Sequence, residues 1–254
     1  MATKARGHMK RGLLLITAIA MLAACNKDEP VVEVPVSINL QHLSGSNALA
    51  LGTAVTTPLG EAVTFNVFKY YLSNFSVVYS NGAEHKISDT YFLVDEANAS
   101  SKTFSFNVPE GQVKELRFWI GVDSARNVSG VQTGALDPAN GMFWTWNSGY
   151  IFAKLEGRSP VSPAPLTAVT YHIGGFRTGQ NALRPISIPL PTAISVNNSS
   201  RYTITLTADV MKWFRSKTDI SIATEPFTME PGSLAMKVAD NYAQMFALKE
   251  VKKN

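Results

Sequence analysis

The feature that most constrains the fold of this chain is a succession of short segments in which apolar and polar residues alternate. In residues 201–209, Tyr202, Ile204, Leu206 and Ala208 are each followed by a polar residue. Alternation with a period of two indicates a β-strand with one buried face and one exposed face. Similar segments, separated by polar turns, occur at residues 36–43, 62–68, 70–79, 91–94, 102–108, 112–122, 150–155, 168–175 and 186–190. The sequence therefore predicts an all-β protein, an antiparallel β-sandwich with long loops.

One helix is expected near the C-terminus, and a shorter one at residues 211–214. Between residues 234 and 248 the apolar side chains are spaced close to one helical turn apart. They are Leu234, Val238, Tyr242, Met245 and Phe246. The chain shows no internal repeat and no low-complexity block, so we expect residues 36–254 to form a single domain.

The first 25 residues have the anatomy of a bacterial lipoprotein signal peptide. Lys10 and Arg11 precede the apolar run 12–24, which is too short to cross a bilayer but has the length of a signal-peptide core. Small residues then lead to Cys25, the only cysteine of the chain. We expect cleavage before Cys25 and lipidation of its thiol, followed by a tether at residues 26–35.

This leader also predicts where the protein resides. Lipid chains, and not a protein helix, would attach it to the membrane. We expect a bacterial envelope protein anchored in the outer membrane, on its periplasmic or its outer face.

The charge balance gives no indication of a nucleic-acid partner. The leader holds four basic residues and no acidic one, which leaves 19 basic and 19 acidic residues in the mature chain. A formally neutral chain without a basic patch is not typical of nucleic-acid binding.

Histidine is scarce, and this restricts the possible metal chemistry. Beyond the leader the chain has only His42, His85 and His172. A zinc enzyme with three histidine ligands would need all of them, and no zinc-protease, nucleophile-elbow, phosphate-loop or dinucleotide motif is present. A hydrolase would instead need a carboxylate pair, such as Asp123 with Asp137 or Glu156. Turn and strand-end hydrogen bonds are the interpretation we favour for these acids, so we expect no catalytic residues and no enzyme activity.

Two of the histidines suit a copper site. His42 falls on the apolar face of its predicted strand, and His172 lies at the end of another. Cu(I) accepts few ligands and binds imidazole, so these two residues can form a site without cysteine. The alternative is that both are hydrogen-bonded structural residues.

Residues 141–152 hold two of the four tryptophans and are the expected centre of function. As a strand, this stretch places Met142, Trp144 and Trp146 on one face. Aromatic residues on one face are typical of a sandwich core. With Tyr150 they can also form a stacking platform for a glycan or another small ligand, which is the alternative function.

Several segments carry a resemblance to a known family. In order along the chain they are residues 38–42 with 49–52, 68–75, 91–95, 120–123, 140–150, 154–157 and 171–174. The most specific are Asn-Gly-Met-Phe-Trp-Thr-Trp-Asn-Ser-Gly-Tyr at 140–150 and Tyr-Leu-Ser-Asn at 71–74. The mature chain resembles the MbnP-like copper-binding proteins of bacterial envelopes, which are related to the methanotroph proteins MopE and CorA.

The resemblance implies a β-sandwich that binds copper through two histidines, which correspond to His42 and His172 here. In characterised members a tryptophan oxidised to kynurenine joins them, and the candidates are Trp144 and Trp146. A dihaem peroxidase-like (MbnH-like) partner is implied for that oxidation, and an outer-membrane transporter is a second expected partner. Met142 is a candidate for a weak thioether contact. We therefore expect a lipoprotein that binds copper for storage, delivery or uptake.

Overall fold

The structure is a computed structural model that describes residues 1–3, 32–145 and 149–254. Val31–Asn254 form one compact unit. Cys25, the rest of the expected signal peptide beyond its first three residues and most of the expected tether lie outside the described residues. The described part consists mainly of strands in two sheets, with few helices, which confirms the predicted all-β sandwich.

Sheet A has β1 at its centre. Its strands are β1 (Glu33–Ser44), β2 (Asn47–Ala48), β7 (Thr103–Pro109), β13 (Tyr202–Asp209) and β15 (Phe246–Lys253). β1 pairs antiparallel with β2 and β7 and parallel with β13, which pairs in turn with β15. β1 begins at Glu33, and Val34 is fully buried. Residues 33–35, the last three of the expected tether, therefore belong to the sheet.

Sheet B is larger and is organised around β4. Its strands are β3 (Ala54–Thr56), β4 (Ala62–Tyr79), β5 (Glu84–Lys86), β6 (Tyr91–Asp95), β8 (Gly111–Ile120), β9 (Phe143–Trp144), β10 (Gly149–Arg158), β11 (Ala168–Gly174), β12 (Arg184–Val196) and β14 (Phe227–Thr228). The main order is β12-β8-β4-β10-β11-β14. β4 is 18 residues long and also pairs with β3, β5 and β6. Among the described strands, β11–β14 is the second parallel pair beside β1–β13.

The helices are short and lie between strands. They are α1 (Ser124–Val128), α2 (Ser233–Tyr242) and the 3₁₀ helices η1 (Ala99–Lys102), η2 (Gly134–Leu136), η3 (Pro138–Asn140), η4 (Pro165–Thr167) and η5 (Val210–Trp213). η5 agrees with the short helix expected at 211–214. α2 confirms the C-terminal helix, but it ends at Tyr242 and does not continue to residue 248.

The residues after α2 form the edge strand β15. In its pairing with β13, Phe246 lies opposite Ala208, Leu248 opposite Leu206, and Val251 opposite Ile204. The apolar spacing of this segment fits a helix nearly as well as a strand, but the pairing places apolar side chains next to apolar ones. Tertiary contacts of this kind override a local preference.

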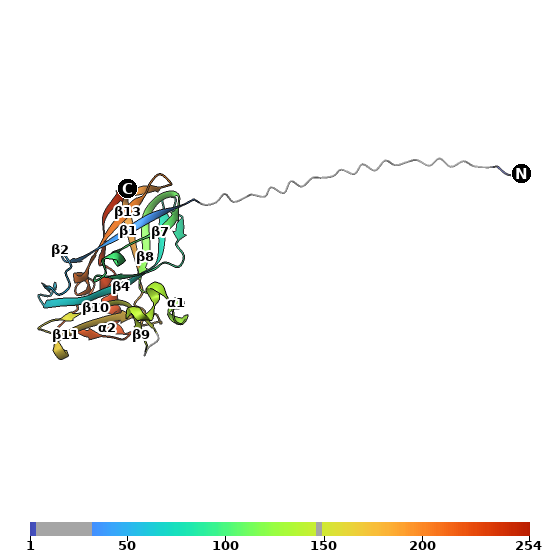
Figure 1. Ribbon diagram of the computed structural model, residues 1–254. Helices are drawn as coiled ribbons and strands as arrows, with labels where there is room; N and C mark the ends of the chain where they lie inside the picture. The colour runs from blue at the N-terminus through green and yellow to red at the C-terminus, as the bar shows by residue number, and fades with distance from the viewer. Residues whose placement is uncertain (4–31, 146–148) are drawn as a thin grey trace. The chain divides into compact units, whose positions relative to one another are not determined.

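The core fills the space between the two sheets. Along β1, every second side chain from Val34 to His42 is buried, as the alternation predicts. Figure 1 shows β1, β7 and β13 grouped at one end of the domain, and β9, β11, α1 and α2 at the other. The inner face of sheet B contributes Phe68, Tyr70 and Tyr171, which contact further aromatic rings in the interior.

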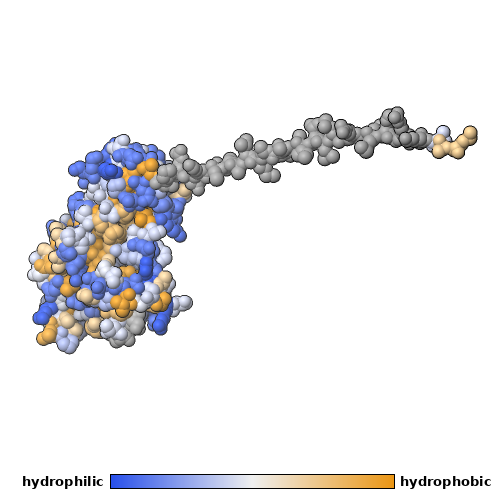
Figure 2. Space-filling model, turned by 45° about the vertical axis from the view of Figure 1, so that its right-hand side comes forward, coloured by the Kyte–Doolittle hydropathy of each residue, from blue (hydrophilic) through white to orange (hydrophobic). Residues whose placement is uncertain are grey.

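The outer surface mixes polar and apolar residues. In Figure 2, apolar side chains on the visible face occur in small groups between hydrophilic ones. Among the described residues, no helix is long and apolar enough to cross a membrane.

The importance of the core of sheet B can be tested with a pair of leucine substitutions. Leu155 of β10 is fully buried, whereas Leu166 is 77 % exposed. We expect Leu155→Ala to lower the free energy of unfolding by about 2–5 kcal/mol, because it removes buried apolar surface and leaves a cavity. Leu166→Ala is the matched control and should change it by less than about 0.5 kcal/mol. Urea denaturation measures both, and similar effects of the two substitutions would contradict the packing described.

Candidate functional site

The tryptophan stretch forms a hairpin and not the single strand that its sequence suggested. β9 pairs antiparallel with β10, so that Trp144 lies opposite Gly149 and Phe143 opposite Tyr150. Trp146 lies outside the described residues. Trp144 is 4 % exposed and Tyr150 1 % exposed. These two side chains are therefore core residues of the hairpin and do not present an open stacking platform.

The loop before this hairpin covers the outer face of sheet B. The hydroxyl of Tyr71, on β4, donates to the carbonyl of Ala135 at 3.0 Å, and that of Tyr150 donates to the carbonyl of Leu136 at 2.8 Å. The two tyrosine rings also contact each other edge to face. The hydrogen bonds of these two tyrosine hydroxyls thus hold the long loop expected after Val128 against the sheet.

Two of the carboxylates that we considered for a hydrolase are held in capping hydrogen bonds. Asp123 caps α1 by accepting from the backbone N–H of Arg126, and Asp137 caps η3 by accepting from that of Ala139. Hydrogen bonds from Tyr91, Asn74 and backbone N–H groups hold the pKa of Asp123 low although burial acts in the opposite direction. These roles agree with the turn interpretation of both residues.

His172 lies on the same outer face. Across the sheet it is the register partner of Lys154 on β10, which is in turn the partner of Lys69 on β4. Directly opposed residues point to the same side of a sheet. The neighbours of Lys69 along β4, Phe68 and Tyr70, therefore point to the opposite side, into the core.

The two nitrogens of the His172 ring have different environments. Nε2 lies 2.6 Å from Oε1 of Glu156, whereas Nδ1 is buried and has no hydrogen-bond partner among the described residues. A carboxylate can only accept, so Nε2 carries the proton, and in the neutral ring the lone pair is on Nδ1. Metal-binding histidines are commonly oriented in this way by a carboxylate on the other nitrogen. Nothing in the local sequence pattern indicates this role for Glu156, although its segment 154–157 carries part of the family resemblance.

The ring of Trp144 packs against Gly174, near the end of the strand that carries His172. Gly174 follows His172 by two residues on β11, so their side-chain directions coincide. A Cβ atom at Gly174 would come within 2.5 Å of the backbone oxygen of Tyr150, and within 2.7 Å of Cζ3 and 2.8 Å of Cη2 of Trp144. The bare backbone of Gly174 thus allows the six-membered ring of Trp144 to pack on the same face as His172.

Charged side chains also lie near His172. Lys154 donates from Nζ to the carbonyl of Gly141 at 2.7 Å and lies 3.8 Å from Glu156. Burial lowers the pKa of Lys154, and the hydrogen bond from His172 lowers the pKa of Glu156. Lys69 is paired with Asp95 at 2.9 Å. Glu156 is therefore ionised at neutral pH and holds the His172 ring in place.

His42 occupies a different environment, in the interior of the sandwich. Its ring contacts Phe68 and Tyr70, with centroids 4.9 and 5.4 Å away. Nδ1 lies 2.6 Å from Oε2 of Glu96, and Nε2 lies 2.7 Å from the hydroxyl of Tyr70. Both ring nitrogens are thus in hydrogen bonds.

The structure does not bring His42 and His172 together. His42 contacts the inner face of β4, whereas His172 lies on the outer face and two strands away, on the order of 10 Å along the sheet. Within the described ranges, no group of three or more His, Cys, Asp and Glu side chains could hold a metal ion. His42 and His172 are therefore separate in this arrangement, and of the two His172 is the histidine with a nitrogen that has no partner among the described residues.

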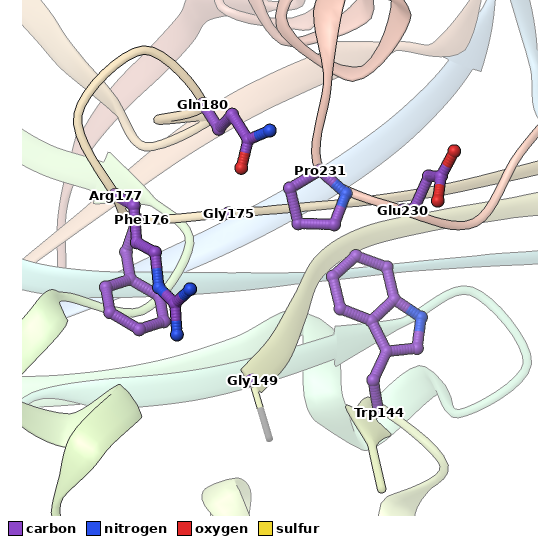
Figure 3. Close-up of a pocket in the computed structure, with 8 residues that line it drawn as sticks. All are labelled: Trp144, Gly149, Gly175, Phe176, Arg177, Gln180, Glu230 and Pro231. Atoms are coloured by element: carbon purple, nitrogen blue, oxygen red, sulfur yellow. The ribbon is translucent and has the colours of Figure 1, made fainter. Parts of the chain in front are cut away.

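A small recess opens beside Trp144. It has a volume of about 200 Å³ and is lined by Trp144, Gly149, Gly175, Phe176, Arg177, Gln180, Glu230 and Pro231. Figure 3 shows Pro231 over the six-membered ring of Trp144, with Arg177 and Glu230 on opposite sides. The recess connects the edge of this buried indole with solvent.

Comparison with known proteins supports the resemblance seen in the sequence. A profile of the MbnP family matches residues 33–232. Among solved structures, MbnP from Methylosinus trichosporium matches with 15 % sequence identity and a TM-score of 0.49, over 72 % of this chain and 78 % of that chain. No curated protein matches.

The pairing of Glu156 with His172 predicts a pH dependence of stability. Because the pKa of Glu156 is lower in the folded domain than in the unfolded chain, the stability it contributes is present above the unfolded value, about 4.3, and is lost as the pH falls through the folded value. We expect Glu156→Gln to reduce the free energy of unfolding at about pH 6, with a difference from wild type that shrinks towards about pH 3. Urea denaturation over this range measures it, and a constant difference would contradict the pairing of an ionised Glu156 with His172.

Proposed function

Because this chain belongs to the MbnP family, a family related to copper binding, we propose that it is a bacterial envelope lipoprotein that binds copper at His172. The observation that carries this proposal is the buried Nδ1 of His172, which has no partner among the described residues while Nε2 is bonded to Glu156. A buried nitrogen of this kind costs about 1–3 kcal/mol if it stays unsatisfied. A copper ion is the ligand that would satisfy it.

One imidazole nitrogen is not a complete site, and Trp144 can supply the next donor. Oxidation of its indole to kynurenine would open the five-membered ring and give an aryl amine and a ketone. Such groups can approach a metal, whereas the indole N–H can only donate a hydrogen bond. Trp144 packs on Gly174, on the same face as His172. This position makes Trp144, of the two candidates, the residue that we propose is modified.

His42 is assigned a structural role in this proposal. Its nitrogens already bond to Glu96 and Tyr70, and its ring lies on the inner side of sheet B. Recruiting it as a ligand for a site shared with His172 would break one of these hydrogen bonds and require passage through the sheet. The soft, low-coordinate chemistry of Cu(I) is compatible with a site of few ligands on the outer face.

The remaining parts of the proposal come from the leader and the family. Lipidation at Cys25 would hold the domain at the outer membrane, where copper could be stored or passed on to a transporter. A dihaem peroxidase-like partner would remove the electrons during tryptophan oxidation. The protein itself would have no enzymatic activity.

Copper analysis of histidine variants tests the assignment. Protein from its own cells should retain about one copper per chain after dialysis, and His172→Gln should lose it, because Nδ1 is removed as a ligand. His85→Gln is the matched control, since His85 lies on the distant strand β5, and His42→Gln should also keep the metal. Absence of copper from the wild type, or its full retention in folded His172→Gln, would refute the proposal.

Mass spectrometry of the same material tests the two covalent modifications. The peptide that contains Trp144 should have lost one carbon and gained one oxygen relative to its sequence. The mature N-terminus should be Cys25 carrying acyl chains, and Cys25→Ser should prevent both cleavage and lipidation. An unmodified Trp144 in cells that contain the natural oxidising partner would contradict the kynurenine proposal, and an unprocessed leader would contradict the anchor.

A further inference from the structure

Tyr70 differs from the other buried tyrosines in what its hydroxyl bonds to. Four buried tyrosines donate to backbone carbonyls: Tyr71 to Ala135, Tyr150 to Leu136, Tyr171 to Glu225 and Tyr242 to Ala182. The hydroxyl of Tyr70 lies instead 2.7 Å from Nε2 of His42. Among the buried tyrosines of the described part, Tyr70 is thus the one that meets a side chain able to accept a proton.

The ring of His42 is itself hydrogen-bonded to a carboxylate. Nδ1 of His42 lies 2.6 Å from Glu96, which also pairs with Lys102 at 2.8 Å. The side chain of His42 is fully buried, whereas those of Glu96 and Lys102 are 12 and 22 % exposed. Since the carboxylate accepts from Nδ1, Nε2 accepts from the Tyr70 hydroxyl. The result is a directed chain of hydrogen bonds that leads from the core to the surface.

The charges along this chain of hydrogen bonds favour protonation of the His42 ring once Tyr70 has been oxidised. Burial, and then the nearby charge of Glu96, raise the pKa of Tyr70 well above its usual value, so the neutral phenol keeps its proton. Burial alone would raise the pKa of Glu96, but hydrogen bonds from His42 and Lys102 outweigh it and lower the pKa. Glu96 is therefore an anion that would stabilise a cationic His42 ring.

These observations matter for one-electron chemistry. A phenol that loses an electron becomes a strong acid, and in a dry core it needs a base within hydrogen-bond reach. A backbone carbonyl cannot take the proton in a stable form, but imidazole can. We propose that Tyr70 is a proton-coupled redox site: a strong one-electron oxidant removes an electron from the ring, the O–H bond breaks, and the proton forms an N–H bond at Nε2 of His42.

The reaction is balanced and reversible. The products are a neutral Tyr70 radical, a protonated His42 paired with Glu96, and an oxidant reduced by one electron. Return of an electron to Tyr70 and of the proton from Nε2 restores the phenol. The site would hold one oxidising equivalent in the core, and it involves neither His172 nor Trp144.

Neighbouring aromatic rings provide a path by which an electron can leave Tyr70 and return to it. The ring of Phe246 contacts Tyr70 edge to face at 5.8 Å, and Phe246 is half-buried on the edge strand β15. Trp213 is a second oxidisable ring, linked to Tyr70 through Phe68, which lies 5.3 Å from Tyr70 and 5.9 Å from Trp213. Its Nε1 is buried without a hydrogen-bond partner among the described residues, so it lacks a proton acceptor.

Tyr91 is the other tyrosine bonded to an ionisable side chain, and it is a poorer site. Its hydroxyl donates to Asp123, whose pKa is held low, so this carboxylate is a weak proton acceptor. The guanidinium of Arg126 also lies over the Tyr91 ring, 5.5 Å from its centroid. A cation at this position opposes removal of an electron from the ring.

Photo-oxidation of the purified full chain without added metal tests the site. Flash-generated tris(bipyridine)ruthenium(III) serves as the oxidant, and electron paramagnetic resonance of rapidly frozen samples detects tyrosyl radicals. We expect a tyrosyl signal in the wild type that falls about tenfold or more in Tyr70→Phe and in His42→Gln. Tyr242→Phe is the matched control, because Tyr242 is equally buried but bonds to a carbonyl, and it should leave the signal unchanged.

A second measurement uses the wild type alone and therefore tests the proposal even if the variants do not fold. In wild-type protein, radical formation should be slower in D₂O than in H₂O, because the O–H bond breaks in the same step. A signal that survives in Tyr70→Phe, that is unaffected in folded His42→Gln, or that shows no isotope effect would overturn the proposal. Since no copper is present, these outcomes are independent of those for the copper site.

Discussion

The alternation of side chains along β4 is the constraint on which the rest of the domain depends. Phe68 and Tyr70 point into the sandwich, whereas Lys69 and Tyr71 point to the opposite side, and the pairing with β10 and β11 carries this division across sheet B. The inner side is covered by sheet A and the outer side by the loop held through Tyr71. Residues 70–73 of β4 are therefore buried on both faces of the sheet, and each face offers an enclosed environment for polar chemistry there.

His42 and His172 show the consequence of separating the two faces of sheet B. His42 is completed by protein groups on both nitrogens, which suits a proton acceptor that stays in place. His172 is completed on one nitrogen only. An unsatisfied buried nitrogen lowers the free energy of unfolding by about 1–3 kcal/mol, which is a large share of the stability of a domain. The same residue type is thus part of a hydrogen-bonded chain on the inner face, whereas on the outer face it keeps one ring nitrogen without a partner among the described residues.

Local patterns in the sequence predict the strands and the inward direction of His42, because alternation is visible within a few residues. They do not predict which face His172 occupies, since this depends on pairing with Lys154 and Lys69, far away in the sequence. The alternation over residues 141–152 predicted one strand, because it does not show that Phe143 and Trp144 pair with Tyr150 and Gly149. Family resemblance singled out both histidines and both tryptophans as candidates, but it did not indicate that His42 and His172 lie on opposite faces of sheet B.

The packing around Gly174 links the position of Trp144 to the sheet itself. A methyl group at residue 174 would overlap the indole and would come closer still, to 2.5 Å, to the backbone oxygen of Tyr150. Gly174 therefore allows two close approaches at once, that of the β10 backbone and that of the Trp144 ring. Any larger residue at this position would have to displace the strand as well as the tryptophan, so sheet pairing and aromatic packing depend on the same missing side chain.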